Sequence, residues 1–241
     1  MSCDHRCCGQ WGKAACHHGG SKDTLRRQSL RLVLIRHGET YWNEERRIQG
    51  GGSDIELNEV GMKQTARLAL LLKDERIDRV ISSPMKRALV MAQAVAKEHK
   101  LPVEVKEGLR EIDVGEFEGL PLSSLSGSFS QLLMKWWEGG IRRLPGGESF
   151  AELQKRCWGA VEPLLGSHDG NRTIVVLGHY FVTLAIIFKA LGFPLEYLPK
   201  FRIDSGGISI IELADYGPRL VTFNDTSYLW ERCGGKAGCR R

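Results

Sequence analysis

Residues 32–40 limit what this chain can fold into more than any other stretch. They read Leu-Val-Leu-Ile-Arg-His-Gly-Glu-Thr, an unbroken apolar run that ends at Arg36 and His37. Four apolar residues without polar alternation indicate a strand buried on both faces, as in a parallel sheet flanked by helices. Open α/β sheets bind ligands beyond the carboxyl ends of such strands. The run therefore predicts a site where Arg36 and His37 leave the sheet, with Gly38 permitting a sharp turn.

The two side chains at this edge suit phosphate chemistry. The Arg36 guanidinium is a permanent cation whose planar fork matches phosphate oxygens. A neutral His37 imidazole is a good nucleophile near neutral pH. A four-residue match can also arise by chance. The placement of this motif directly after a buried strand favours a phosphate site. The other residues of such a site would then come from elsewhere in the chain.

Two later strand ends carry residues of the same kind. Residues 173–177 repeat the apolar run and are followed by His179 and a helical pattern. A short strand expected at 79–82 precedes a helix with Pro84 as its first residue and Arg87 in its first turn. A helix N-terminus and a cation together attract phosphate. Each residue alone fits an ordinary position, but together they predict two histidines and two arginines at one edge of the sheet.

Strand-like and helix-like segments alternate from residue 32 to about 224, and no Pro/Ser/Gly linker divides them. This alternation predicts a single α/β domain at 31–230 between tails at 1–30 and 231–241. Hydrophobic residues make up 42% of the chain, enough for a sizeable core. The expected elements are strands near 32–35, 79–82, 103–105 and 173–177, helices near 58–75, 84–95, 149–165 and 180–191, helical excursions at 120–145, and a closing hairpin at 208–213 and 219–223.

Charge and cysteine placement exclude several function classes. The net charge of +5 arises in the tails, which carry +3 each and leave residues 31–230 at −1. A nearly neutral body offers no nucleic-acid surface. Six of the seven cysteines also lie in the tails, which argues against a secreted disulfide scaffold. With no signal-peptide core and no apolar stretch of about 20 residues, the sequence indicates a cytoplasmic enzyme without a membrane partner.

The tail of residues 1–30 carries soft metal ligands without a recognisable metal-binding spacing. Cys/His tracts can bind zinc, but these positions match no closed ligand set. We therefore expect a disordered tail that binds metal only adventitiously, and no metal in the mechanism. The residues concerned are Cys3, His5, Cys7, Cys8, Cys16, His17 and His18.

Seven motifs follow one another along the chain in a consistent order. They are Arg36-His37-Gly38-Glu39-Thr40 with Asn43, Leu57-Asn58-x-x-Gly61, Ser82-Ser83-Pro84-x-x-Arg87-Ala88, Leu109-Arg110-Glu111-Ile112, Gly115-Glu116-Phe117-Glu118-Gly119, Pro145-Gly146-Gly147-Glu148-Ser149 and Gly178-His179. In these motifs the chain resembles the two-histidine phosphatase superfamily, which includes cofactor-dependent phosphoglycerate mutases, and the resemblance covers about residues 31–229. The resemblance implies a three-layer, mostly parallel sheet with helices on both faces and a small helical excursion over the site.

The resemblance also implies a role for each site residue. His37 would be the nucleophile and Glu111 the proton donor. Arg36 and Arg87 would clamp the phosphate, together with His179 as the second histidine. No cofactor and no metal would be required. The remaining residues expected to line the phosphate or substrate pocket are Asn43, Gln49, Gly50 and Tyr180, the last through its amide.

Phosphate-ester chemistry gives these roles a physical reason. The ester carries up to two negative charges that repel a nucleophile, so the two arginines and a protonated or hydrogen-bonding His179 would neutralise its oxygens. His37 would attack in line while a carbonyl holds its other ring nitrogen. The resulting phosphohistidine would be hydrolysed by water. Glu111 can protonate the leaving oxygen only if its pKa is raised, which we attribute to partial burial and neighbouring negative charge.

The motifs favour a phosphatase over two alternatives. A phosphoglycerate mutase-type phosphotransferase of this superfamily carries extra helical sequence over the site, and residues 119–146 are too few to supply it. A non-catalytic phosphate-binding module would have no need of both histidines, both arginines and Glu111 together. The expected substrate is a small phosphorylated metabolite, and the sequence leaves the oligomeric state open, a homodimer included.

Within the phosphatases, the motifs at 115–119 and 145–149 resemble a branch that holds α-ribazole-5'-phosphate phosphatases of cobalamin biosynthesis and broad-specificity phosphatases. The motifs do not separate these substrates. Trp136 and Trp137 could stack on an aromatic base or pack in the core. Tyr180 and Phe181 stand where small residues are common in the family, which predicts a bulkier pocket wall.

Overall fold

The computed structural model describes residues 29–166 and 171–230. In this part of the chain six strands form one sheet in the order β3-β2-β4-β1-β5-β6. The first four of that order run parallel, and β5 and β6 run antiparallel to their neighbours. This confirms the predicted mostly parallel sheet. The strands are β1 (Leu30–Arg36), β2 (Arg79–Ser82), β3 (Val103–Val105), β4 (Arg172–Gly178), β5 (Ile208–Ala214) and β6 (Gly217–Asp225).

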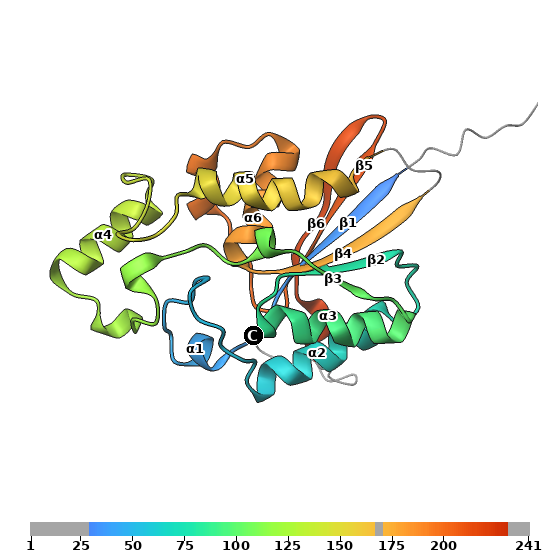
Figure 1. The fold of residues 1–241 in the computed structure, drawn as a ribbon, viewed down its shortest axis with the longest axis horizontal. Helices are drawn as coiled ribbons and strands as arrows, with labels where there is room; N and C mark the ends of the chain where they lie inside the picture. Colours follow the sequence, from blue (N-terminus) through green and yellow to red (C-terminus); the bar gives the residue numbers. More distant parts are fainter. Residues whose placement is uncertain (1–28, 167–170, 231–241) are drawn as a thin grey trace, which may run out of the picture.

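Helices cover both faces of the sheet, as expected for three layers (Figure 1). In β1, Leu32 and Leu34 face one core together with α5 (Phe150–Val161) and α6 (Tyr180–Leu191). Val33 and Ile35 face the other core together with α2 (Glu59–Leu72) and α3 (Lys86–His99). Successive side chains of a strand point to opposite faces, so the unbroken apolar run of β1 serves both cores.

The register of the parallel strands aligns their carboxyl ends. Arg36 at the end of β1 pairs with Gly178 at the end of β4, and Ser82 at the end of β2 pairs with Leu177. The His37 amide then donates to the Gly178 carbonyl at 3.0 Å. Because β4 lies between β1 and β2, the residues that follow all three strands emerge side by side.

Two helix starts differ in what caps them. The Asn58 side chain accepts from the Gly61 amide and caps α2, as its sequence position suggests, and α2 ends at Leu72. The helix expected to begin at Pro84 instead begins at Lys86. The Asp54 carboxylate accepts from the Lys86 amide at 2.7 Å, so a side chain from a distant loop provides the cap that the local sequence lacks.

Gly38 has a different role from the sharp turn expected of it. Its backbone φ is not in the left-handed region. A Cβ at this position would lie 3.1 Å from the Gly61 Cα, and a Cβ on Gly61 would lie 2.1 Å from the Glu39 carbonyl oxygen. The two glycines therefore allow the start of α2 to pack directly against the backbone that follows His37.

The excursion expected at 120–145 contains α4 (Gly127–Trp137), which lies beyond the carboxyl ends of the parallel strands, as does the single turn α1 (Tyr41–Glu44) (Figure 1). Trp136 is buried and stacks on Phe150, with ring centroids 4.8 Å apart. The predicted Cys/His-rich tail and the C-terminal tail lie outside the described residues, apart from Ser29 and Leu30. No helix in the described ranges is long and apolar enough to span a bilayer.

Candidate active site

His37 and His179 meet at the aligned strand ends, with ring centroids 5.2 Å apart and an interplanar angle of 62°. His37 is buried, and its Nδ1 lies 2.7 Å from the Gly38 carbonyl oxygen. A carbonyl can only accept, so Nδ1 carries the proton and Nε2 keeps a free lone pair. Burial, Arg87 and Arg36 lower the pKa of His37 well below its ordinary value. The ring is therefore neutral near neutral pH, with its unprotonated nitrogen available.

His179 is held by two side chains. Arg87 Nε donates to Nδ1 at 3.3 Å, and Nε2 lies 2.7 Å from the Ser83 hydroxyl. Since the guanidinium can only donate, the proton of a neutral ring is on Nε2. Burial and the charge of Arg87 lower the pKa of His179 well below its ordinary value. Of the two forms left open by the sequence, the structure supports the neutral, hydrogen-bonded one.

Arg87 is completely buried in the first turn of α3. Besides His179, it donates to the carbonyl oxygens of Ser53 at 3.0 Å and Gly50 at 2.9 Å. Burial lowers its pKa to about 10, which still leaves the guanidinium charged at neutral pH. Arg87 thus brings a fixed positive charge to the two histidines.

Arg36 is less constrained than Arg87. One terminal nitrogen donates to the Ile203 carbonyl at 2.6 Å, and the guanidinium carbon lies 5.3 Å from the centre of the Tyr180 ring. The Arg36 Nε is buried without a hydrogen-bond partner. Burial lowers the pKa of this group, against the opposing effect of Glu111. Arg36 therefore keeps donors for an anion.

Gly50 was expected to bind phosphate directly, and the structure gives it another role. Its amide donates to both oxygens of the Glu118 carboxylate at 3.2 Å, and its carbonyl accepts from Arg87. With its donor engaged, Gly50 orients Arg87 instead of facing a ligand. Glu118 and Ser83 were not predicted to act here, although both belong to motifs found in the sequence. Their contacts depend on side chains far away along the chain.

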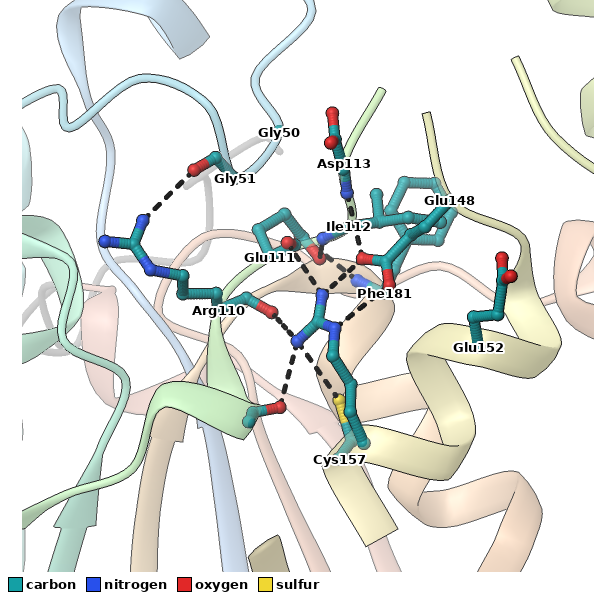
Figure 2. A network of polar contacts seen from close by, with 12 residues as sticks. Gly50, Gly51, Arg110, Glu111, Ile112, Asp113, Glu148, Glu152, Cys157 and Phe181 are labelled. Carbon is teal, nitrogen blue, oxygen red and sulfur yellow. Dashed lines mark hydrogen bonds and ion pairs between the residues drawn. The ribbon is translucent and has the colours of Figure 1, made fainter. Parts of the chain in front are cut away.

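Glu111 is almost completely buried beside the start of α6. Its carboxylate accepts from the amides of Ile112 at 2.9 Å and Phe181 at 3.3 Å (Figure 2). Burial raises its pKa, although the two amides and the cations Arg87 and Arg36 act in the opposite direction. The raised pKa agrees with the sequence-based expectation. The expected cause is only partly right, because the charged neighbours that act on it are positive.

The loop that carries Glu111 is clamped by an ion pair. Arg156 of α5 donates to the carbonyl oxygens of Gly108, Arg110 and Glu111 at 2.9, 2.6 and 2.9 Å. It also pairs with the Glu148 carboxylate. That carboxylate in turn accepts from the Asp113 amide at 3.0 Å (Figure 2). Glu148 belongs to the Pro-Gly-Gly-Glu-Ser motif, whereas nothing in the sequence distinguishes Arg156 from other helical arginines.

A cavity of about 590 Å³ opens next to these groups. The predicted residues Arg36, His37, Asn43, Gln49, Glu111 and Tyr180 are all in its wall, whereas Arg87 and His179 are not among the lining residues. Asn43 also forms a capping box with Thr40, and the Thr40 hydroxyl donates to Gln49 at 3.0 Å. The rest of the wall consists of Arg47, Ile48, Val114, Leu122, Leu133, Met134, Trp136, Trp137, Glu138, Phe181 and Arg202.

The chemistry available at this edge is that of nucleophilic displacement on an anion. A neutral imidazole faces the cavity, two guanidiniums supply positive charge, and a buried carboxyl with a raised pKa can give up a proton. Among residues 29–166 and 171–230, no group of three or more His, Cys, Asp or Glu side chains could hold a metal ion.

Comparisons with known proteins identify the family. The family model of the histidine phosphatase superfamily (branch 1) matches residues 32–226. Phosphoserine phosphatase 1 of Hydrogenobacter thermophilus is 31% identical, over 84% of this chain and 95% of that protein.

Two solved structures are also similar. A phosphoserine phosphatase from Entamoeba histolytica in complex with 3-phosphoglyceric acid is 33% identical, with a TM-score of 0.73 over 83% of this chain and 100% of that one. A mycobacterial glucosyl-3-phosphoglycerate phosphatase is 25% identical, with a TM-score of 0.75 over 83% of this chain and 100% of that one. These relatives are phosphatases, and the chain belongs to the histidine phosphatase superfamily.

Proposed function

We propose that the protein is a metal-independent phosphomonoesterase that acts on a small phosphometabolite through a phosphohistidine on His37. The observation that carries the proposal is the state of the His37 ring. Its Nδ1 is fixed on the Gly38 carbonyl, its pKa is lowered, and it lines a cavity together with Glu111. A neutral imidazole with one free lone pair is the form that can attack phosphorus.

The proposed reaction has two steps. His37 Nε2 attacks phosphorus while the bond from phosphorus to the ester oxygen breaks and Glu111 protonates that oxygen. Arg36 and Arg87 offset the negative charge on the phosphoryl oxygens. Water then attacks the phosphohistidine, its proton returns to Glu111, and the nitrogen–phosphorus bond breaks to release phosphate. The pKa of Glu111 is raised by burial, which supports its role as the acid.

Two alternative functions, a phosphotransferase and a non-catalytic binding module, are less well supported than the phosphatase. A phosphoglycerate mutase-type phosphotransferase would need more helical sequence over the site, and of residues 120–145 only α4 and a short turn at 122–124 are helical. A non-catalytic phosphate-binding module is disfavoured by the orientation of His37.

α-Ribazole-5'-phosphate remains one candidate substrate, since Trp137 lines the cavity, whereas Trp136 is already stacked on Phe150. The cytoplasmic location and a homodimer remain predictions from the sequence.

Hydrolysis of p-nitrophenyl phosphate in the presence of EDTA tests the proposed function. We expect full turnover with the chelator, because the mechanism uses only side chains of this chain, and release of phosphate to water without an added phosphate acceptor. A panel with α-ribazole-5'-phosphate, sugar phosphates, phosphoserine and 3-phosphoglycerate ranks the substrates. Loss of hydrolysis in the presence of EDTA would contradict the proposal. Binding of phosphate esters without hydrolysis would contradict it as well.

The Arg156 clamp gives a separate prediction. Replacing Arg156 with Lys keeps the charge but removes the planar set of donors that holds the Glu111 loop. We expect kcat on alkyl phosphates to fall about tenfold, and kcat on p-nitrophenyl phosphate to fall much less, because an aryl leaving group needs less help from the acid. Steady-state kinetics on both substrates measure this ratio.

Arg143→Lys is the matched control, because Arg143 forms an exposed ion pair with Glu152 at 2.8 Å and exposed pairs contribute little to stability. The control is expected to retain both activities. An equal loss of both activities in Arg156→Lys would mean that the clamp supports the fold in general and does not act through Glu111.

A further inference from the structure

The cavity beside His37 has many large apolar side chains in its wall. Away from the catalytic groups its wall includes Leu122, then Leu133 and Met134 of α4, and Trp137 and Phe181, next to the charged residues Arg47, Glu138 and Arg202. Leu122 and Met134 are 50% and 58% exposed. Large apolar side chains that stay exposed around a concave site mark a surface for binding an apolar group.

Aromatic contacts hold part of this wall in place. The Trp137 ring lies 5.8 Å from that of Phe181 and 6.3 Å from that of Tyr180, measured between centroids. Phe181 also packs against Trp136 at 5.4 Å. These rings join α4 to the first turn of α6, next to Glu111, so the apolar wall begins where the leaving group of the ester would lie.

The cations of this wall are already paired, apart from Arg36. Arg47 donates to the Glu45 carboxylate and to the Gly119 carbonyl. Arg202 donates to the Asp204 carboxylate at 2.8 Å. These ion pairs are exposed and weak, but Glu138 also lines the wall, and its negative charge would repel a carboxylate close to the phosphate. The wall therefore favours an organic group without a carboxylate.

The donors that do lack partners point to a few acceptors on the ligand. Three buried side-chain nitrogens of the described residues have no hydrogen-bond partner, namely Arg36 Nε, Gln49 Nε2 and Trp136 Nε1. All three residues line this cavity. An unpaired buried donor is unfavourable, and an acceptor on a bound ligand removes that cost. Phosphate oxygens suit Arg36 and Gln49, and the unpaired Trp136 donor would suit one acceptor within the apolar part.

We infer that the substrate is a phosphomonoester of a bulky, largely apolar or aromatic alcohol, without a carboxylate next to the ester. This inference rests on the proposed phosphatase activity and specifies its substrate class. Binding energy from the apolar group would then raise kcat/KM although that group takes no part in the chemistry.

A series of n-alkyl phosphates tests the inference. Ethyl, butyl and hexyl phosphate have leaving groups of nearly equal basicity, so differences in kcat/KM report burial of the chain. We expect kcat/KM to rise about two- to fourfold for each methylene buried in the cavity. Phosphoserine and 3-phosphoglycerate should fall at least roughly tenfold below hexyl phosphate, the loss expected when a charged group meets an apolar wall.

Two double variants test whether side chains of the cavity wall cause the preference for longer alkyl chains. Leu122→Ser with Met134→Ser should lower the ratio of kcat/KM for hexyl over ethyl phosphate about tenfold, as expected for the loss of two apolar contacts. The matched control, Leu70→Ser with Met62→Ser, removes similar exposed side chains of α2 that do not line the cavity. It should keep the wild-type ratio.

These experiments distinguish a failure of the inferred substrate class from a failure of the proposed phosphatase activity. If p-nitrophenyl phosphate is hydrolysed but the alkyl series is flat, or phosphoserine matches hexyl phosphate, the substrate class is wrong and the proposed function stands. Equal ratios in the two double variants would also overturn the substrate class. If no ester is hydrolysed, the proposed function is wrong, and the inferred substrate class, which rests on it, is wrong as well.

Discussion

Replacing His37 with alanine is expected to lower kcat/KM for p-nitrophenyl phosphate by a thousandfold or more, on the order seen when a catalytic nucleophile is removed. The reason is geometric. His179 cannot substitute for it, because both of its ring nitrogens are already engaged, by Arg87 and Ser83. The remaining activity should come only from charge stabilisation by the arginines. Steady-state kinetics with the purified variant measure the loss.

A second measurement tests the intermediate itself. Rapid acid-free quenching of wild-type enzyme with labelled substrate should trap phosphate on the protein through a bond that survives base and is lost in acid, as a phosphoramidate is. His37→Ala should trap none. His99→Ala is the control, since His99 lies on α3 and contacts the Leu72 carbonyl instead of the site. Full activity in His37→Ala would refute the mechanism.

Replacing Glu111 with glutamine is expected to have the second-largest effect. A general acid contributes about 10²- to 10⁴-fold to rate, so hydrolysis of alkyl phosphates should fall by about that factor. The loss on p-nitrophenyl phosphate should be smaller, about tenfold or less, because its leaving group is stable without a proton. Kinetics on hexyl and p-nitrophenyl phosphate give both factors.

The dependence of kcat on pH tests whether Glu111 acts as the proton donor. Burial raises the pKa of Glu111, so the acid is protonated below that raised pKa and lost above it. In wild type, kcat on alkyl phosphates should therefore fall as pH rises through the raised pKa. The glutamine variant cannot titrate and should lack this descending limb. The lowered pKa values of His37 and His179 mean that neither ring is expected to lose a proton near neutral pH, so neither contributes this limb there.

Glu116→Gln is the matched control for the carboxyl, because Glu116 is exposed in the neighbouring loop. It should retain activity on both substrates and the wild-type pH profile. Equal losses on alkyl and aryl esters in Glu111→Gln, or an unchanged descending limb, would assign the proton to another group.

Most of the residues that the structure brings together at the strand ends could be predicted from the sequence. An apolar run interrupted by Arg36 and His37, and a second run before His179, are local patterns that report burial and strand ends. The raised pKa of Glu111 was also expected. Its electrostatic surroundings were not, because Arg36 and Arg87 approach it from other elements, and sequence separation carries no direction in space.

The supporting contacts were not predictable from local pattern. Ser83 bonds to His179 across 96 residues, Arg156 reaches Glu111 across 45, and Asp54 caps α3 across 32. Gly50 was assigned to phosphate and instead orients Arg87. Each of these contacts requires knowing which elements become neighbours.

The sequence by itself determined the α/β class, the strand ends and the side chains that each end presents, because burial and helix or strand periodicity depend on near neighbours along the chain. Only the tertiary structure decided that β4 lies between β1 and β2. That order aligns the three carboxyl ends and brings His37, Arg87 and His179 together. Long-range hydrogen bonding and packing select strand order, and no short stretch of sequence encodes either.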